Sequence, residues 1–175
     1  MDTRLTTARA DLRPIEPGDA EELLRVFRDP AVRRYLLDDA IVGEDWVRDE
    51  IDSSRASFAG EGWGLWAVRL SDSDVVAGFA GFRHFFDPPE VQLLYGLAPD
   101  FWGRGLATEA ARAVVDYAFE QLDFEVVVAA TDVPNVSSVR VMERLGMTFD
   151  RATDEGEHGT VYYRLTSASA RRGET

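Results

Sequence analysis

The sequence predicts one α/β domain built around a mixed sheet, on three observations. The chain has 175 residues, of which 45% are hydrophobic, so it can bury one sizeable core. Its apolar residues recur with a period of two in some segments and of about 3.6 in others, which indicates strands and helices in turn. The predicted order is strand, two helices, three strands, helix, strand, helix and two strands, without repeats or an internal boundary. This order favours a single layered sheet.

The first third of the chain is predicted to form a strand and two helices. Residues 9–15 have the pattern of a short strand. Asp19 stands where it can cap a helix over residues 20–27, whose apolar positions are three and four apart. A second helix is expected over about residues 44–58, which carry another apolar stripe.

Strands dominate the middle of the chain. Residues 62–70 and 75–85 are expected to form a hairpin, and residues 90–97 a third strand that a proline ends. From Gly105 the apolar period changes to about 3.6, which predicts a helix packed on the sheet. Residues 124–130 are continuously apolar, so we expect a central strand that is covered on both faces.

The last third of the chain is predicted to be a helix, two strands and a tail. Asn135 begins the helix, and Gly146 ends it in a left-handed conformation. Residues 147–151 and 160–165 are expected to be strands, and residues 167–175 a disordered tail.

The charged residues exclude several functions. There are 32 acidic and 19 basic residues, for a net charge of −13, and every basic residue is arginine. Without lysine the chain cannot form a P-loop or a Schiff base, and without cysteine it has no disulfide or thiolate metal site. The negative charge disfavours binding to nucleic acid or to an anionic membrane. No apolar run approaches the roughly 20 residues of a membrane span, and no secretory signal is evident, so a cytoplasmic protein is expected.

Two glycines suggest a binding site. The run DFWGRGLATEA, residues 100–110, places Gly103 and Gly105 between a predicted strand and a predicted helix. Main-chain amides and the positive helix end could bind a diphosphate there, with Arg104 adding a charge-assisted contact. The alternative is a plain turn, and the spacing alone does not decide between the two. A dinucleotide fold is disfavoured because Thr108 stands where the pattern G-x-G-x-x-G requires glycine or alanine.

The glycine loop belongs to a larger pattern. The run LYGLAPDFWGRGLATEA, followed by NVSSVRVMERLGM, resembles the Gcn5-related N-acetyltransferase (GNAT) superfamily, in particular its RimJ/RimL-like branch. The family's diphosphate-loop pattern falls on residues 102–107, with Trp102 in place of the usual glutamine or arginine. The resemblance implies a GNAT domain over residues 1–166, with a mixed, mostly antiparallel sheet of about seven strands and helices on both faces. It also implies transfer of an acetyl group from acetyl-CoA to a primary amine, without a metal.

The resemblance further implies where acetyl-CoA binds. The strand that ends at Leu97 would diverge from its neighbour, so that main-chain groups of Leu97 and Ala98 pair with the pantetheine arm. The diphosphate would lie on the amides of the glycine loop. Asn135 would reach the pantetheine or the diphosphate, although capping of its own helix explains an asparagine there equally well. The cofactor-binding residues expected on this resemblance are Leu97, Ala98, Trp102, Gly103, Arg104, Gly105, Leu106, Ala107, Thr108, Asn135 and Ser138.

The reaction needs a base for the ammonium group and an acid for the departing thiolate. Many family members place a tyrosine acid at the position of Met142, so Ser138 is the expected substitute; a polar residue without a catalytic role is the alternative. A glutamate base is common at the position of Gln92, which cannot accept a proton. Glu90, or a water bound through Gln92, is the hypothesis for the base. His84, beside two phenylalanines near a strand end, is expected to be structural or exposed.

The acidic residues bear on the identity of the acceptor amine. Residues 36–52 are rich in carboxylates, which favours a cationic amine such as a protein N-terminus, a polyamine or an aminoglycoside-like compound. A merely solvated acidic face explains the same residues. Two other functions stay open: a sensor that binds acyl-CoA without turning it over, and a generic nucleotide-binding domain. The expected assembly is a monomer or a homodimer.

Overall fold

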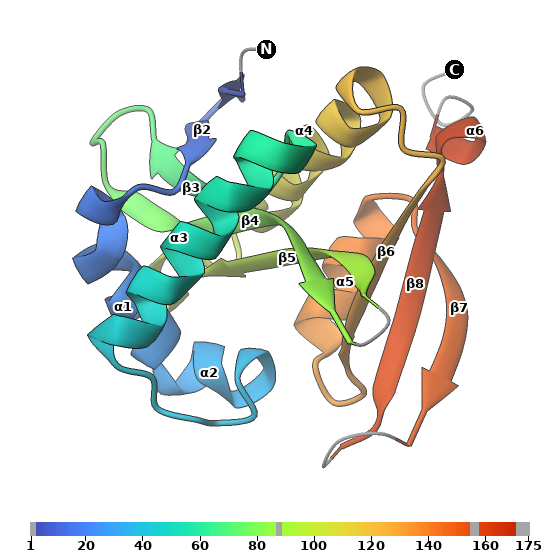
Figure 1. Cartoon of the computed structure of the whole chain (residues 1–175). Coiled ribbons are helices and arrows are strands. Elements are labelled where there is room, and N and C mark those ends of the chain that lie inside the picture. The colour runs from blue at the N-terminus through green and yellow to red at the C-terminus, as the bar shows by residue number, and fades with distance from the viewer. Residues whose placement is uncertain (1–2, 87–88, 155–157, 171–175) are drawn as a thin grey trace.

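The computed structural model describes residues 3–86, 89–154 and 158–170 (Figure 1). These residues form an eight-stranded sheet with helices packed against it. The strands are β1 (Leu5–Thr6), β2 (Ala10–Pro14), β3 (Leu65–Leu70), β4 (Val76–Phe85), β5 (Glu90–Leu97), β6 (Val126–Asp132), β7 (Thr148–Thr153) and β8 (Thr160–Thr166). The α-helices are α1 (Ala20–Arg28), α2 (Pro30–Leu36), α3 (Glu44–Glu61), α4 (Leu106–Gln121), α5 (Val136–Arg144) and α6 (Ser167–Ala170), and the 3₁₀ helices are η1 (Pro17–Asp19) and η2 (Pro99–Phe101).

The sheet confirms the predicted class. Its strand order is β1-β2-β3-β4-β5-β6-β8-β7, and neighbours are antiparallel except for the parallel pair β5 and β6. The described part of the chain has one strand more than the seven expected, because Leu5 and Thr6 pair with Leu12 and Asp11. Two residues are too few for an alternating pattern to predict them.

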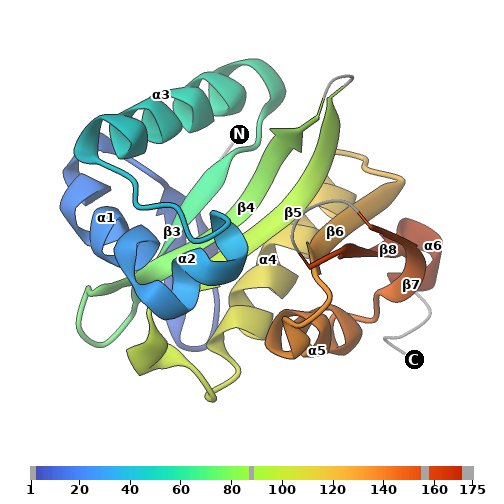
Figure 2. The same cartoon turned by 90° about the horizontal axis from the view of Figure 1, so that it is seen from below.

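Helices cover both faces of the sheet (Figure 2). Helices α1, α2 and α3 pack on one face, over a core that includes Leu23, Ile51 and Phe79. Helices α4 and α5 pack on the other. Because successive side chains of a strand point to opposite faces, Leu94 of β5 contacts the first core and Leu93 belongs to the second. We call these the α3 face and the α4 face.

Helix α2 was not expected from the apolar pattern. Its start carries local signals, since Pro30 occupies the first turn and the Asp29 side chain accepts a hydrogen bond from Ala31 N at 2.9 Å. With seven residues, the helix is too short for its apolar stripe to stand out.

The prediction that Asp19 caps α1 through its side chain was wrong. Asp19 stands at the N-cap position, yet it makes no side-chain cap bond and is 1% exposed. Its carboxylate instead lies 2.6 Å from Arg13 Nη2 and 3.1 Å from Arg69 Nη1, and it accepts a bond from Glu16 N. A buried carboxylate is stable when charged partners compensate it, and β2 and β3 supply two.

The expectation that β6 is covered on both faces holds only in part. Val127, Ala129 and Thr131 are buried, whereas Val128 and Ala130 between them are half-buried. Helices α4 and α5 cover the α4 face of this strand, while the core under α1, α2 and α3 contains no residue of β6.

The C-terminal third follows the prediction at the end of α5. Gly146 has a φ of +84°, and Met147 N donates to Met142 O at 3.0 Å, as in a glycine-ended helix. In the segment expected to be disordered, Ser167–Ala170 form the short helix α6, and residues 171–175 lie outside the described residues. Within the described residues, none of the helices is both long enough and apolar enough to span a bilayer.

Candidate active site

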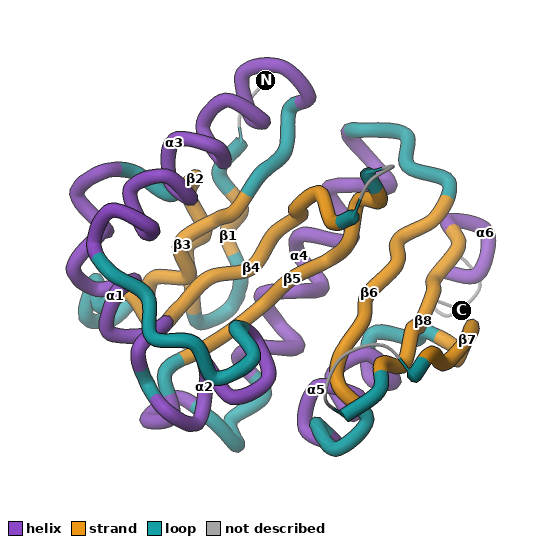
Figure 3. The backbone as a smooth tube through the Cα atoms, turned by 60° about the horizontal axis from the view of Figure 1, so that its bottom comes forward, coloured by secondary structure: helices purple, strands orange, loops and turns teal. Residues whose placement is uncertain are grey.

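The sheet opens between β5 and β6. These strands pair only through Gln92 with Val128 and Leu93 with Ala129. Beyond these two pairs the strands diverge, as Figure 3 shows. We call the space between Leu94–Leu97 of β5 and the end of β6 the β5/β6 opening. Divergence of the parallel pair, which the family resemblance implied, is therefore present.

Main-chain groups of β5 face this opening. Ala98 N donates to Ala77 O at 2.8 Å, across the boundary with β4. In an antiparallel ladder, bonded and non-bonded pairs alternate, so Leu97 and Tyr95 direct their N–H and C=O groups away from β4. Leu97 and Tyr95 are thus the residues of β5 that can offer main-chain hydrogen bonds to a chain lying in the opening.

Leu97 and Ala98, both expected to pair with the pantetheine, differ in what they can offer. Leu97 O accepts a 2.7 Å bond from Trp102 Nε1 and keeps a second lone pair. Ala98 uses both main-chain groups within the chain, because its N–H binds Ala77 O and its C=O accepts from Phe101 N at 3.0 Å. The geometry favours Leu97 over Ala98 as a cofactor contact.

The glycine loop runs from the end of β5 into α4. Gly103 and Gly105 have φ angles of +72° and +75°, a region that side chains other than glycine rarely adopt. The first hydrogen bond of α4 joins Glu109 N to Gly105 O, so the amides of Leu106, Ala107 and Thr108 have no acceptor within the helix. These amides and the positive end of α4 can bind an anion.

Arg9 holds this loop in place. Its Nη1 donates to Arg104 O at 2.7 Å, and its Nε and main-chain N bind the carboxylate of Glu109 at 2.7 and 2.9 Å. Although desolvation alone would raise it, hydrogen bonds from Thr7 and Arg9 hold the pKa of Glu109 below its usual value. The side chain of Arg104 is exposed and is free of this contact, which uses its carbonyl.

Two hydroxyl groups meet beside the opening. Tyr95 OH lies 2.9 Å from Ser138 Oγ and donates to Ser138 O at 3.0 Å. If the tyrosine proton is used on the carbonyl, the serine hydroxyl donates to the tyrosine oxygen. Burial raises the pKa of Tyr95 beyond the ordinary range of a phenol, so this hydroxyl stays protonated at neutral pH. Ser138 is therefore half of a hydroxyl pair.

Asn135 caps α5. Its side-chain oxygen accepts from Ser138 N at 3.3 Å, while its Nδ2 donates to Thr131 Oγ1 at 3.0 Å. These bonds account for the capping interpretation and also fix Ser138 against the end of β6. Met142, at the family's usual tyrosine position, is 1% exposed and belongs to the core.

The residues expected to supply the base lie on the α3 face. Gln92 is 4% exposed, and its Nε2 donates to Glu90 Oε1 at 2.8 Å. Glu90 Oε2 lies 3.5 Å from Arg151 Nη2. The structure thus brings Gln92 and Glu90 together, on the opposite face of β5 from the side chain of Tyr95.

The histidines lie apart from the hydroxyl pair. His84 Nε2 contacts Glu61 at 3.0 Å and its ring lies 4.8 Å from that of Trp63, while His158 is exposed. No cluster of three metal-ligating side chains occurs among the residues that the structure describes.

Sequence reasoning missed Tyr95 and Arg9. In the run LYGL, Tyr95 has the pattern of an apolar strand residue. Its role depends on its buried hydroxyl group, which the sequence pattern does not indicate. Arg9 contacts Glu109, one hundred residues later, so nothing local indicates its role.

The chain matches a known domain over most of its length. Residues 9–148 match the family described as "Acetyltransferase (GNAT) domain". The protein YkkB of Bacillus subtilis, described as uncharacterized, is 31% identical over 154 residues, or 85% of this chain and 87% of YkkB. The "FsC-acetyl coenzyme A-N(2)-transacetylase" of Aspergillus fumigatus is 30% identical over 183 residues, or 93% of this chain and 75% of that protein.

Solved structures share the fold. A GNAT-family acetyltransferase from Bacillus anthracis superposes with a TM-score of 0.80 at 21% identity, covering 94% of this chain and 99% of that one. The ribosomal L7/L12 α-N-protein acetyltransferase RimL, solved in complex with coenzyme A, has a TM-score of 0.77 at 15% identity, covering 93% and 97%.

The chain therefore belongs to the GNAT acetyltransferase family. It is an acetyl-CoA-dependent N-acetyltransferase, with acetyl-CoA as its co-substrate.

Proposed function

We propose that the protein transfers the acetyl group of acetyl-CoA to a primary amine, with the thioester in the β5/β6 opening and the amine arriving from the α3 face. The observation that carries this proposal is the position of the Tyr95 and Ser138 hydroxyl pair. The pair lies beside the opening, and Tyr95 is close to the end of β5 that leads into the glycine loop.

The glycine loop would bind the diphosphate of acetyl-CoA. The free amides from Gly103 to Thr108 and the start of α4 support this role. Thr108 Oγ1, a buried hydroxyl without a partner in the described chain, is a further donor for a ligand oxygen. Main-chain groups of Leu97 and Tyr95 would pair with the pantetheine arm.

Ser138 would protonate the departing thiolate, with Tyr95 as its proton source. The serine hydroxyl is 2.9 Å from the phenol, and either oxygen can donate, so Tyr95 can replace a proton that leaves Ser138 once its own hydroxyl turns from Ser138 O to Ser138 Oγ. An acid is useful here because a thiol has a pKa of about 8.5, and its thiolate leaves more easily when a proton is supplied.

The acceptor would be a protein N-terminus or a small cationic amine, as in the RimJ/RimL-like branch. The Asn135 and Ser138 spacing and the shared fold with RimL support this branch. The net charge of −13 supports a cationic acceptor and opposes nucleic-acid binding. We further propose residues 1–166 as the catalytic domain, acting in the cytoplasm as a monomer or homodimer.

Thiol release tests the function. The protein is incubated with acetyl-CoA and a panel of amines, and free thiol is followed with time. We expect release that depends on the amine and yields one acetylated amine per thiol, by mass spectrometry. Binding of CoA without amine-dependent release would favour the acyl-CoA sensor, and binding of ATP or NAD in place of CoA would favour a nucleotide-binding domain.

A further inference from the structure

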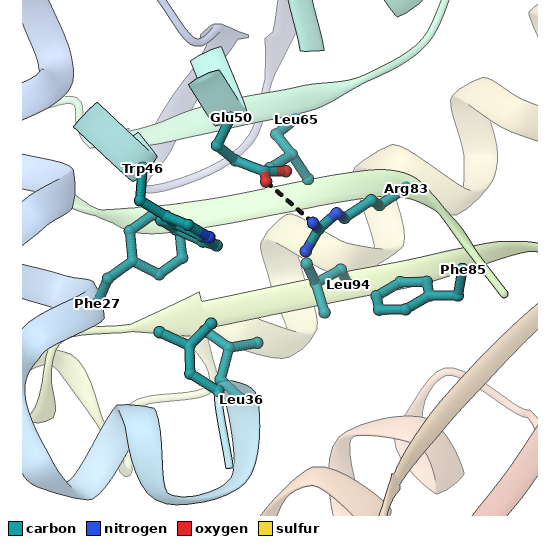
Figure 4. A pocket seen from close by; sticks show the side chains of 9 residues that line it. Phe27, Leu36, Trp46, Glu50, Leu65, Arg83, Phe85 and Leu94 are labelled. Carbon is teal, nitrogen blue, oxygen red and sulfur yellow. Dashed lines mark ion pairs between the residues drawn. The ribbon is translucent and has the colours of Figure 1, made fainter. Parts of the chain in front are cut away.

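A hollow lies on the α3 face, against the strand that borders the β5/β6 opening. Figure 4 shows it between helices α1, α2 and α3 and strands β4 and β5. Its walls are largely apolar, with Phe27, Trp46 and Leu36 among the side chains that line it. The volume that the centres of water molecules can occupy is about 20 Å³, which is room for one water molecule.

Glu50 places a carboxylate in this apolar hollow. The side chain is 10% exposed, and its Oε2 lies 3.2 Å from Arg83 Nη2, as the dashed line in Figure 4 marks. Burial raises the pKa of Glu50, and the charge of Arg83 opposes this in part. Arg83 is itself 39% exposed, with its guanidinium 5.4 Å from the centre of the Phe85 ring.

The other groups that face Glu50 carry no charge. Helix α1 contributes Phe27, α2 contributes Leu36, and β5 contributes Leu94 to the same hollow. Among the described residues that line it, Glu50 and Arg83 are the charged ones. The proton affinity of Glu50 is therefore set by desolvation and by Arg83.

The hollow adjoins the point where β5 leaves β6. Leu94, in its wall, directly follows Leu93, the last residue of β5 that pairs with β6. Tyr95, the next residue, points to the α4 face. The carboxylate and the hydroxyl pair thus lie on opposite faces of the same stretch of β5, as a base and an acid on the two sides of a thioester would.

Three other carboxylates of the acidic segment 36–52 form ion pairs with arginines at the surface. Asp39 lies 3.4 Å from Arg33, and Glu44 and Asp45 lie 3.1 and 3.5 Å from Arg48. Glu50 differs from these three in its burial and in its place at the sheet.

We propose that Glu50 is the proton acceptor for the acceptor amine, acting through the one water that the hollow admits. This proposal rests on the N-acetyltransferase function proposed above. It gives the chain a base although Gln92 stands where the family often has glutamate.

An N–H bond of the acceptor's ammonium breaks, its proton passes to the water, and the water passes a proton to the Glu50 carboxylate. The amine lone pair then forms the N–C bond with the thioester carbonyl carbon. As the C–S bond breaks, its electron pair stays on sulfur, which takes a proton from the Ser138 and Tyr95 pair. The second proton of the nitrogen restores that pair, and Glu50 releases its proton to solvent.

A pH profile of kcat/KM tests this role. The assay uses acetyl-CoA and whichever of 2-phenylethylamine, spermidine and the peptide Ala-Ala-Ala-amide the wild-type protein acetylates fastest. A base must be unprotonated, so the wild-type rate should fall on the acid side as Glu50 takes up a proton. We expect Glu50→Gln to lower kcat/KM at neutral pH by about tenfold or more and to remove this acid limb, with the dissociation constant for acetyl-CoA unchanged.

Two variants separate a base from a structural ion pair. Arg83→Met removes the charge that lowers the pKa of Glu50, so the acid limb should move to higher pH and persist. Glu44→Gln, which removes an exposed carboxylate from the same helix, should leave the profile unchanged.

Two results would overturn the proposal. One is an unchanged acid limb in Glu50→Gln; the other is the same loss in Arg83→Met as in Glu50→Gln, which would indicate that the ion pair only positions the hollow. Wild-type protein that binds CoA but releases no thiol with any of the three amines would instead refute the proposed function, and this proposal with it.

Discussion

The two faces of the β5/β6 opening are built from different parts of the chain. On the α4 face, the groups offered to a ligand come largely from the main chain of one segment, residues 97–108. On the α3 face, they are the side chains of Glu50, Arg83 and Gln92, which three separate elements supply. A main-chain site depends on local conformation, so a short sequence can indicate it. A side-chain site depends on which elements the fold brings together.

The largest effect on turnover is expected at the hydroxyl pair of Tyr95 and Ser138. Ser138→Ala should lower kcat by roughly 10²-fold while acetyl-CoA affinity stays nearly unchanged, because the lost group acts on the leaving thiolate. Steady-state kinetics and calorimetry measure the two quantities. Ser137→Ala, at the exposed neighbouring position, is the matched control.

Tyr95→Phe sharpens this prediction. If the pair acts as a unit, the double variant should be little worse than Ser138→Ala alone. A wild-type kcat in Ser138→Ala, at saturating acetyl-CoA and with chemistry rate-limiting, would exclude Ser138 as the acid and leave it as a helix-end residue.

The next effect is expected in the main-chain site. Gly105→Val should weaken acetyl-CoA binding by about tenfold or more, because valine at a φ of +75° is strained and the loop must shift. Isothermal titration measures the affinity. Gly60→Val, at a position with open space around it, should bind like wild type. If a folded Gly105→Val protein bound acetyl-CoA as tightly as wild type, the glycine loop would not be part of the acetyl-CoA site.

A smaller effect is expected from the support of the loop. Glu109→Gln weakens the contact with Arg9, which is half-exposed, so we expect acetyl-CoA affinity to fall by no more than about fivefold. The folded-state pKa of Glu109 lies below its ordinary 4.5, so the stability that the carboxylate contributes is present above that value and is lost as pH falls through the folded-state pKa. Thermal unfolding of both proteins at pH 7 and at pH 3 should therefore show a difference that shrinks in acid; a constant difference would argue against the ion pair.

The smallest effect is expected at Trp102. Trp102→Phe removes the bond to Leu97 O but keeps an aromatic ring at a position that is 48% exposed. Loss of one such hydrogen bond should cost about 1 kcal/mol or less, so acetyl-CoA affinity should change by less than about fivefold. A larger loss in titration would mean that the indole orients the whole end of β5.

The two regions also differ in how much of each could be predicted from the sequence. Gly103, Gly105 and the end of β5 could be predicted, because positive φ angles and a strand end have local residue requirements. The partnership of Tyr95 with Ser138, 43 residues apart, could not, since it depends on how α5 docks beside the opening. The same holds for Glu50, which in sequence resembles its acidic neighbours and differs from them by its burial and its place at the sheet.

A crystal structure with coenzyme A bound would locate the cofactor relative to the glycine loop and the hydroxyl pair. We expect the diphosphate on the amides of residues 103–108 and the pantetheine along β5. We also expect the sulfur within hydrogen-bond reach of Ser138 Oγ or Tyr95 OH. A sulfur atom outside the β5/β6 opening, or a diphosphate bound away from the glycine loop, would contradict this placement of the cofactor.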